Sequence, residues 1–154
     1  MKKQKDYLKI KGFTRLQIVE DGDEIVGDSG WVGPNQVVNL GFQDYIVATI
    51  GAIAGSKTAS HLAIGTGTVP AAAATSLAGE TGTRITSTNT VVASKTLQLT
   101  CQFAGSQMGG TCTIQNVGIF NTSSGGTLLA GNTYTTSQWA SNQNVNATYQ
   151  LRFS

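Results

Sequence analysis

Alternation of apolar and polar residues in the second half of the chain predicts a series of short β-strands. The clearest is residues 145–153, where every second residue is apolar and the residues between them are Asn, Thr, Gln and Arg. This period of two is typical of a strand with one buried face. Further strands are expected at 84–92, 96–103, 111–120 and 127–134, separated by Gly-rich turns. Six to eight such strands favour a mainly β, single-domain β-sandwich or barrel-like fold.

Residues 96–103 and 111–120 are predicted to form a hairpin across the glycines at 104–110. The Asn116-Val-Gly118 segment suggests a β-bulge that shifts the alternation of the second strand. In this hairpin we expect Cys101 and Cys112 nearly opposite each other, either as two buried thiols, which we favour, or as a pair that cross-links after lysis. A second hairpin is expected at 16–26, where Asp21-Gly22 suits a two-residue turn.

The pattern changes to a helical period near residue 41. Apolar residues and one threonine recur with the spacing of a single helix face, at Phe42, Tyr45, Ile46, Thr49, Ile50 and Ile53. The spacing predicts a short amphipathic helix at 41–54, with Asn39 as its N-cap and Gly55 at its end. We expect its apolar stripe to pack against the sheet.

The chain leaves the sheet at residues 61–84. The apolar stretch 62–64 runs into Gly65-Thr-Gly-Thr68, and Pro70 prevents the strand from continuing. A run of small residues follows, so Leu77 is expected to anchor the loop on an apolar surface. Glu80 and Arg84 are close enough in sequence to pair across it.

These residues also carry a resemblance. The segment Ala63-Ile-Gly-Thr-Gly-Thr68 with Pro70, the later Asn116-Val-Gly-Ile-Phe120 and the strand Gly125-Gly-Thr-Leu-Leu-Ala130 resemble a group of small structural proteins encoded in tailed-bacteriophage genomes. The resemblance covers roughly residues 35–153. It implies a protein of the phage particle, in the head, tail or fibres, without catalytic motifs.

Charge is sparse and unevenly placed. Only 12% of the 154 residues are charged, so the surface is expected to be polar but largely uncharged. The formal charge of +2 is too small to indicate a nucleic-acid partner. Six of the ten basic residues lie in the first fifteen: Lys2, Lys3, Lys5, Lys9, Lys11 and Arg15. We predict a basic N-terminal arm at residues 1–12, either solvated or laid along a partner, before a β-rich domain at 13–154.

No targeting or membrane segment is expected. Asp6, Lys9, Lys11 and Arg15 interrupt any apolar core of a signal peptide after the basic start. No apolar run approaches the length of a membrane span. The sequence therefore predicts a protein made in the cytoplasm. The phage resemblance implies that this is the host cytoplasm and that the protein is located in the virion.

Groups for catalysis are few. His61 is the only histidine, and the sequence gives it neither a nucleophile nor an orienting acid, so we interpret it as a structural residue at a strand start. Gly65-Thr-Gly67 lacks the other residues of a dinucleotide or phosphate loop. Two cysteines and one histidine are too few for a structural zinc site. We expect no enzymatic activity, cofactor or metal.

Two functional hypotheses remain open. The first is a capsid decoration, or cement, protein that binds the major capsid protein or other virion proteins, as a homo-oligomer or in many copies on the particle, with a tail, baseplate or fibre component as its variant. The second is a host-receptor or carbohydrate-binding module, which requires exposed aromatic residues such as Trp31 or Trp139. Both tryptophan side chains are expected to fill the hydrophobic core at strand ends. Partner-binding residues are predicted in the basic residues of the arm and at Glu80 and Arg84.

Overall fold

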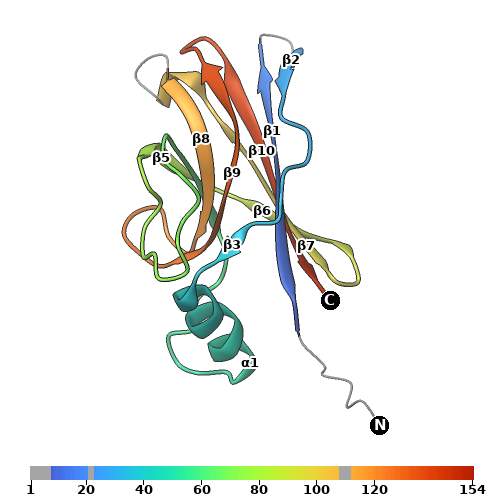
Figure 1. Cartoon of the computed structure of the whole chain (residues 1–154), viewed down its shortest axis with the longest axis vertical. Helices are drawn as coiled ribbons and strands as arrows, with labels where there is room; N and C mark the ends of the chain where they lie inside the picture. Colours follow the sequence, from blue (N-terminus) through green and yellow to red (C-terminus); the bar gives the residue numbers. More distant parts are fainter. Residues whose placement is uncertain (1–7, 21–22, 108–111) are drawn as a thin grey trace.

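Two five-stranded antiparallel sheets form the protein (Figure 1). The structure is a computed structural model and describes residues 8–20, 23–107 and 112–154. Sheet A has the strand order β2-β1-β10-β7-β6, and sheet B has the order β3-β9-β8-β4-β5. The strands are β1 (Ile10–Val19), β2 (Ile25–Asp28), β3 (Gln36–Val37), β4 (His61–Gly65), β5 (Glu80–Thr86), β6 (Thr88–Ala93), β7 (Thr96–Phe103), β8 (Cys112–Phe120), β9 (Leu128–Trp139) and β10 (Asn144–Phe153).

The predicted β-sandwich is confirmed. Its clearest predicted strand is β10, which lies at the centre of sheet A between β1 and β7. The register pairs Val145 with Ile18 and with Phe103, and burial alternates along the strand from Val145 to Leu151. The alternating pattern is therefore reproduced because one face of β10 covers the core and the other faces outward.

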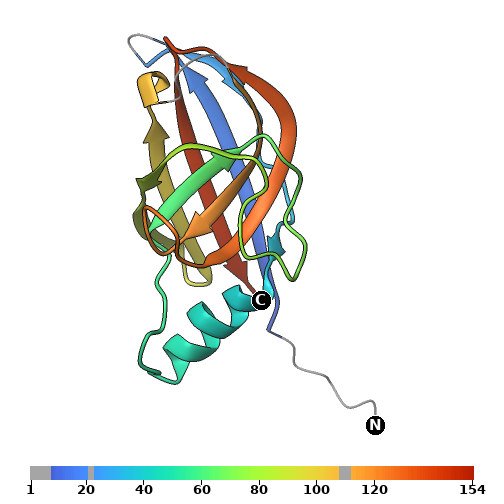
Figure 2. The same ribbon diagram turned by 90° about the vertical axis from the view of Figure 1, so that its left-hand side faces the viewer.

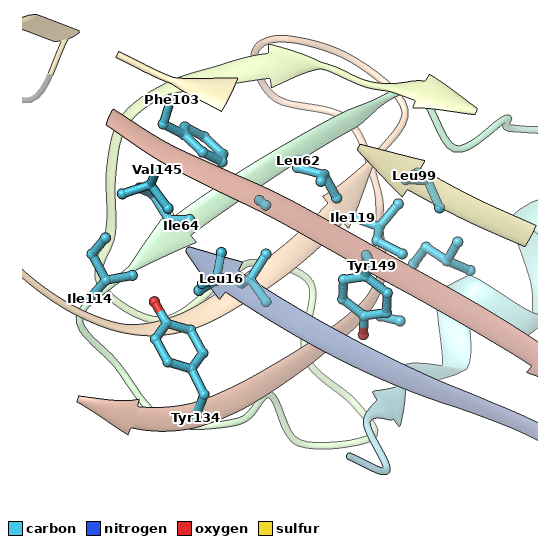
Figure 3. Close-up of a cluster of buried hydrophobic side chains, with 14 of the residues drawn as sticks. Leu16, Leu62, Ile64, Leu99, Phe103, Ile114, Ile119, Tyr134, Val145 and Tyr149 are labelled. Atoms are coloured by element: carbon cyan, nitrogen blue, oxygen red, sulfur yellow. The ribbon is translucent and has the colours of Figure 1, made fainter. Parts of the chain in front are cut away.

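The inner faces of the two sheets enclose the main hydrophobic core. Large aliphatic and aromatic side chains from both sheets meet there (Figure 3), including Leu16 and Tyr149 from sheet A and Leu62 and Ile119 from sheet B. Trp139 belongs to the same cluster and is fully buried. Residues on the inner faces of sheet A and of sheet B thus bury one another, as in other aligned sandwiches.

The chain crosses between the sheets where a hairpin was predicted. β7 pairs with β10 and β6 in sheet A, whereas β8 pairs with β4 and β9 in sheet B. The prediction that β7 and β8 pair is wrong, and Cys101 and Cys112 are therefore not cross-strand neighbours. Cys101 packs against the core, where burial raises the pKa of its thiol to about 12. The predicted bulge is confirmed, because the β8–β9 register shifts between Ile114 and Asn116.

The longer of the two helical segments in the described residues lies at one end of the sandwich and runs from Gly41 to Ile50. The other is a short 3-10 turn after β7, η2 (Gly105–Gln107). A π-helical segment η1 (Gly41–Val47) continues into one α-helical turn, α1 (Ala48–Ile50) (Figure 2). The expected N-cap at Asn39 and the end at Gly55 are both wrong. No side chain caps the start, and the chain turns away at Ala52, which has a positive φ of 49°. In the described part of the chain, no helix is long and apolar enough to cross a membrane.

The helix stripe packs on the sheets only in part. Tyr45 is buried and Ile46 packs against the core, but Phe42, Ile50 and Ile53 are exposed. The expected packing of the whole stripe is therefore wrong. Gly41 lies so close to β9 that a side chain there would meet the carbonyl oxygen of Leu129. Because only this first part of the helix touches the sandwich, its later turns overhang the end of the fold.

Strand pairing begins earlier than the predicted boundary at residue 12. Ile10 already pairs with Phe153 in the β1–β10 ladder, and the backbones of Lys9 and Ser154 exchange two hydrogen bonds. Residues 9–12 therefore belong to the sheet, and the part of the predicted arm before residue 8 lies outside the described residues. The hairpin predicted at 16–26 is confirmed as the antiparallel pair β1–β2, with Asp21 and Gly22 outside the described residues.

Candidate functional site

His61 begins strand β4, as expected for a structural residue. Its Nδ1 lies 2.8 Å from the Ser60 hydroxyl, and its Nε2 lies 3.3 Å from the hydroxyl of Thr86. Both contacts are to neutral hydroxyl groups, and among the described residues no carboxylate forms a hydrogen bond or ion pair with the ring. Among the described residues, no group of three His, Cys, Asp or Glu side chains could hold a metal ion. The expectation that the protein is not an enzyme stays a prediction.

The loop between β4 and β5 covers the outer face of sheet B. Leu77 is buried there in a second apolar cluster with Phe120 and Leu128, so its predicted anchoring role is confirmed. The buried Asn116 side chain donates hydrogen bonds to the carbonyl oxygens of Thr68 at 3.0 Å and Ala78 at 2.8 Å. These contacts tie both ends of the loop to β8.

Arg84 and Glu80 form the predicted pair, and it is largely buried. Arg84 Nε lies 2.6 Å from Glu80 Oε1, and the exposed fractions of the two side chains are 9% and 24%. Arg84 also donates to the carbonyl oxygens of Thr122 and Gly125, and its guanidinium lies 3.4 Å from the ring centroid of Phe120. All these contacts lie within the chain, so the pair holds β5 to the 121–126 turn. Partner binding by Glu80 or Arg84 stays a prediction.

The basic residues of the predicted arm separate into three groups. Lys2, Lys3 and Lys5 lie outside the described residues. Lys9 and Lys11 are exposed at the start of β1. Arg15, in the middle of β1, forms an ion pair with Asp28 on β2, with Nη2 and Oδ2 2.5 Å apart.

Asp28 links the ends of the β1–β2 hairpin. It accepts hydrogen bonds from Arg15, from Gln17 Nε2 at 3.0 Å and from the Gly30 amide at 2.8 Å. The hydrogen bond from Arg15 is the main reason that the pKa of Asp28 lies well below its usual range. Because the folded-state pKa is lowered, the contribution to stability is present above the unfolded pKa of about 3.9 and is lost as the pH falls below it.

We therefore expect part of the acid sensitivity of the fold to disappear in Asp28→Asn. Denaturant unfolding at pH 7 and at pH 3 should show that the wild type loses more free energy of unfolding than the variant, by at most about 1 kcal/mol because the pair is partly exposed. Arg15→Gln removes the partner and should reduce the acid-dependent loss in the same direction. An equal loss in the wild type and both variants would show that the pair contributes nothing.

The two tryptophans have different environments. Trp139 is fully buried, as predicted, and its Nε1 donates to the carbonyl oxygen of Gln143 at 2.5 Å. Trp31 is 44% exposed, so its predicted role as a core plug is wrong. It lies outside sheet A, where the Arg152 guanidinium is 5.8 Å from its ring and 4.2 Å from the ring of Phe13.

The overhanging helix exposes apolar side chains at one end of the molecule. Val47, Ile50 and Ile53 are 64%, 78% and 59% exposed, respectively. Leu8, before β1, and Val91, on the edge strand β6, are also exposed. Charged residues are nearly missing from this helix, where Asp44 is the only one between Gly41 and Ile50. Solvent therefore contacts several large apolar side chains close together in sequence, which is typical of an interaction surface.

An apolar cavity of about 290 Å³ lies between this helix and the neighbouring ends of the sheets. Ile46 and Tyr45 contribute from the helix, and Leu97, Leu151 and Phe153 contribute from sheet A. Lys57 is the charged residue in its wall. A smaller hollow shares Leu97 and Phe153 and includes Lys95. The apolar walls of the cavity and of the hollow, with Lys57 in the first and Lys95 in the second, suit an apolar group that carries negative charge nearby.

This end of the molecule was not predicted as a site from the sequence. Lys57 and Lys95 are isolated lysines in the sequence, and only the fold places them beside the same apolar walls as Ile10 and Phe153. The exposed face of the helix was also missed, because a periodic apolar stripe does not tell what covers it. The register of β1 against β10 pairs Ile10 with Phe153. Knowledge of this register would have been enough to predict that the two residues lie side by side.

Comparisons of the chain with protein-family models, with curated proteins and with solved structures find no match.

Proposed function

We propose that this protein is a structural subunit of a tailed-bacteriophage particle, and specifically a capsid decoration protein that binds the shell in many copies. The observation that carries the proposal is the exposed apolar helix at the end of the sandwich. Val47, Ile50 and Ile53 remain in solvent in the single chain although the sandwich is otherwise well packed. Burying such side chains against a neighbour provides a driving force for association, about 25 cal/mol for each Å² of apolar surface.

Two features of the whole chain support the proposal. The resemblance to phage structural proteins rests on the segments at 63–70, 116–120 and 125–130. These segments form the end of β4, the end of β8 and the start of β9, which are neighbours in sheet B. A surface with few charges also suits close contact with other subunits, because few ions lose their hydration on assembly. A tail, baseplate or fibre component would use the same properties.

A second candidate function, carbohydrate binding, is favoured by one observation. Trp31 exposes an aromatic ring beside Arg152, and Gln150 lies next to Arg152 on the outer face of sheet A. An exposed aromatic ring with neighbouring amide and guanidinium donors can stack on a sugar and bind its hydroxyl groups. This candidate predicts that Trp31→Ala abolishes binding on a glycan array, whereas the structural role predicts no glycan binding to lose.

The structural role is tested by changing Ile50. Ile50→Ala should lower the free energy of unfolding by less than about 0.5 kcal/mol, because the side chain is exposed. Ile50→Asp should keep the melting temperature and reduce the number of copies on purified phage particles, because a charge in an apolar contact must be desolvated.

Val69→Asp is the matched control for Ile50→Asp. Val69 is also exposed, at 44%, but lies on the loop between β4 and β5. The control should leave the copy number unchanged. Normal occupancy of the Ile50→Asp protein on particles would contradict the proposed role of the helix, and the copy number in the wild-type particle separates a decoration protein from a tail component.

A further inference from the structure

Charges of opposite sign occupy the two ends of the molecule. At the tip of the β1–β2 hairpin, Glu20, Asp23 and Glu24 are exposed, and no lysine or arginine lies near them in sequence. At the opposite end, beside the helix, Lys57 lines the apolar cavity and Lys95 lines the smaller hollow that shares Leu97 and Phe153. Lys9 and Lys11 are exposed on either side of Ile10, another residue of the cavity wall. Figure 1 shows the hairpin and the helix at opposite ends of the long axis.

These charges are not neutralised within one chain. Over the described residues, the only ion pairs are Arg15–Asp28 and Arg84–Glu80. The ten residues of β1 separate the two ends by roughly 30 Å. Charges at that distance are screened from each other, because the Debye length is about 8 Å at physiological ionic strength.

The basic end also brings like charges together. Lys11 and Arg152 are directly paired across β1 and β10 and are both exposed. Like charges opposite each other on one face of a sheet are unfavourable unless an anion lies nearby. Asp44 is the one described acid on the helix, and it does not form an ion pair with Lys57.

Each end also offers an apolar group to its counterpart. Ile25 and Val26 follow the acidic residues of the tip and are 52% and 46% exposed. The basic end contains the apolar cavity of about 290 Å³, which is at the low end of the range of about 300–1,000 Å³ for sites that hold drug-sized ligands. A cavity of this size suits one or two aliphatic side chains. The tip thus supplies acidic and apolar groups together, and the basic end supplies their complements.

We infer that the basic end binds the acidic hairpin tip of a second copy of this chain, so that copies associate head to tail. In this contact the Ile25 side chain covers the apolar cavity, and Glu20 and Glu24 approach Lys57 and Lys95. Burial of the apolar side chains supplies most of the affinity, while the charges set orientation and association rate. A contact between two different surfaces forms rings or filaments.

This inference rests on the proposed function in that it names one neighbour of the subunit on the particle. The two can fail separately. A subunit held only by another virion protein would lose copies on the particle in Ile50→Asp and would still not bind itself in solution.

A charge exchange between the two ends tests the inference with the full chain. One variant carries Glu20→Lys and Glu24→Lys, and the other carries Lys57→Glu and Lys95→Glu. Sedimentation velocity over a wide range of concentration should show self-association of the wild type that weakens as salt is added. Each variant alone should associate at least about tenfold more weakly, because positions 20 and 24 and the positions 57 and 95 that they approach then carry charges of the same sign.

An equimolar mixture of the two variants should associate again, because positions 20 and 24 of one variant and positions 57 and 95 of the other then carry opposite charges. Melting curves establish that both variants are folded. Ile25→Asn supplies an independent test without a change of charge and should weaken association, while Val69→Asn, at a similarly exposed valine, should not. A wild type that stays monomeric, a variant that associates alone as the wild type does, or a mixture that stays monomeric would each overturn the inference.

Discussion

Replacing Trp139 with alanine should lower the free energy of unfolding by about 3–5 kcal/mol, one of the two largest effects expected in this protein. The side chain is fully buried in the main core at the end of β9. Its removal leaves a cavity and also leaves the carbonyl oxygen of Gln143 without its indole donor. Since small domains are stable by only about 5–15 kcal/mol, this loss is a large part of the total.

Trp31→Ala is the matched control because it removes the same side chain from an exposed position. It should cost less than about 1 kcal/mol, since much of the ring already contacts water. Denaturant unfolding followed by circular dichroism measures both variants without depending on tryptophan emission. Equal losses would show that Trp31 is as well packed as Trp139.

Fluorescence quenching separates the two residues directly. Acrylamide should quench Trp31 emission in the Trp139→Phe protein strongly, and Trp139 emission in the Trp31→Phe protein only weakly. The comparison reports burial and not stability. It therefore checks the physical reason for the difference in unfolding free energy.

The sequence predicted elements well where one pattern has one structural meaning. The alternation at 145–153 requires a strand with one buried face, and β10 is that strand. The exit of the chain at Gly65 and the anchoring of the loop by Leu77 were predicted because proline cannot continue a central strand and few other apolar residues were available there. The Glu80–Arg84 pair was predicted because the stretch contains no other charges.

Prediction from the sequence was wrong where the pairing of a strand depends on partners far apart in the chain. Residues 96–103 and 111–120 have the pattern of a hairpin, but the same pattern suits two strands that face each other from different sheets. A period of two fixes which side chains point inward and not which strand lies alongside. The assignment of both strands to the inner faces of the sandwich, with Leu99 and Ile114 both buried, satisfies the pattern equally well.

The prediction of how the helix packs was wrong for a related reason. Its stripe was expected to be covered throughout because amphipathic helices usually pack their apolar face. Gly41 fixes the start of the helix against β9, and from there the helix runs beyond the end of the sheets. The covered part ends near Thr49, which lines the cavity, and Ile50 is in solvent. A local apolar pattern therefore predicted the helix but not its neighbour.

The same dependence on the fold applies to the charges. In sequence, the lysines at 57 and 95 are far from those at 9 and 11, so the sequence analysis described only a basic arm. The β1–β10 pairing and the β6–β7 turn bring these lysines to one end. Glu20, Asp23 and Glu24 lie at the opposite end because β1 is ten residues long and spans the sandwich. The separation of charge is thus a property of strand length and register.

Replacing Arg84 with glutamine should destabilise the protein by about 3–5 kcal/mol, because it leaves the partly buried Glu80 carboxylate without its cation. The substitution also removes donors from the carbonyl oxygens of Thr122 and Gly125 and the guanidinium from the ring of Phe120. Arg84→Lys should recover only part of this loss, since an ammonium cannot make the bidentate contact or the stack.

A double-mutant cycle isolates the pair itself. Glu80→Gln, Arg84→Gln and the double variant, compared by denaturant unfolding of the purified protein, should give a coupling energy of about 1–3 kcal/mol. The double variant should be more stable than the sum of the single losses predicts, because no charge is then left alone beneath the loop.

The same variants, compared by their copy number on phage particles, report any role beyond the fold. Since the Arg84 side chain is only 9% exposed and its guanidinium contacts Glu80, the 121–126 turn and Phe120, we expect coupling in the unfolding measurement and no further coupling on particles. Coupling on particles alone would instead place the loop between β4 and β5 at a subunit interface, and no coupling in either measurement would show that the pair does not stabilise the loop.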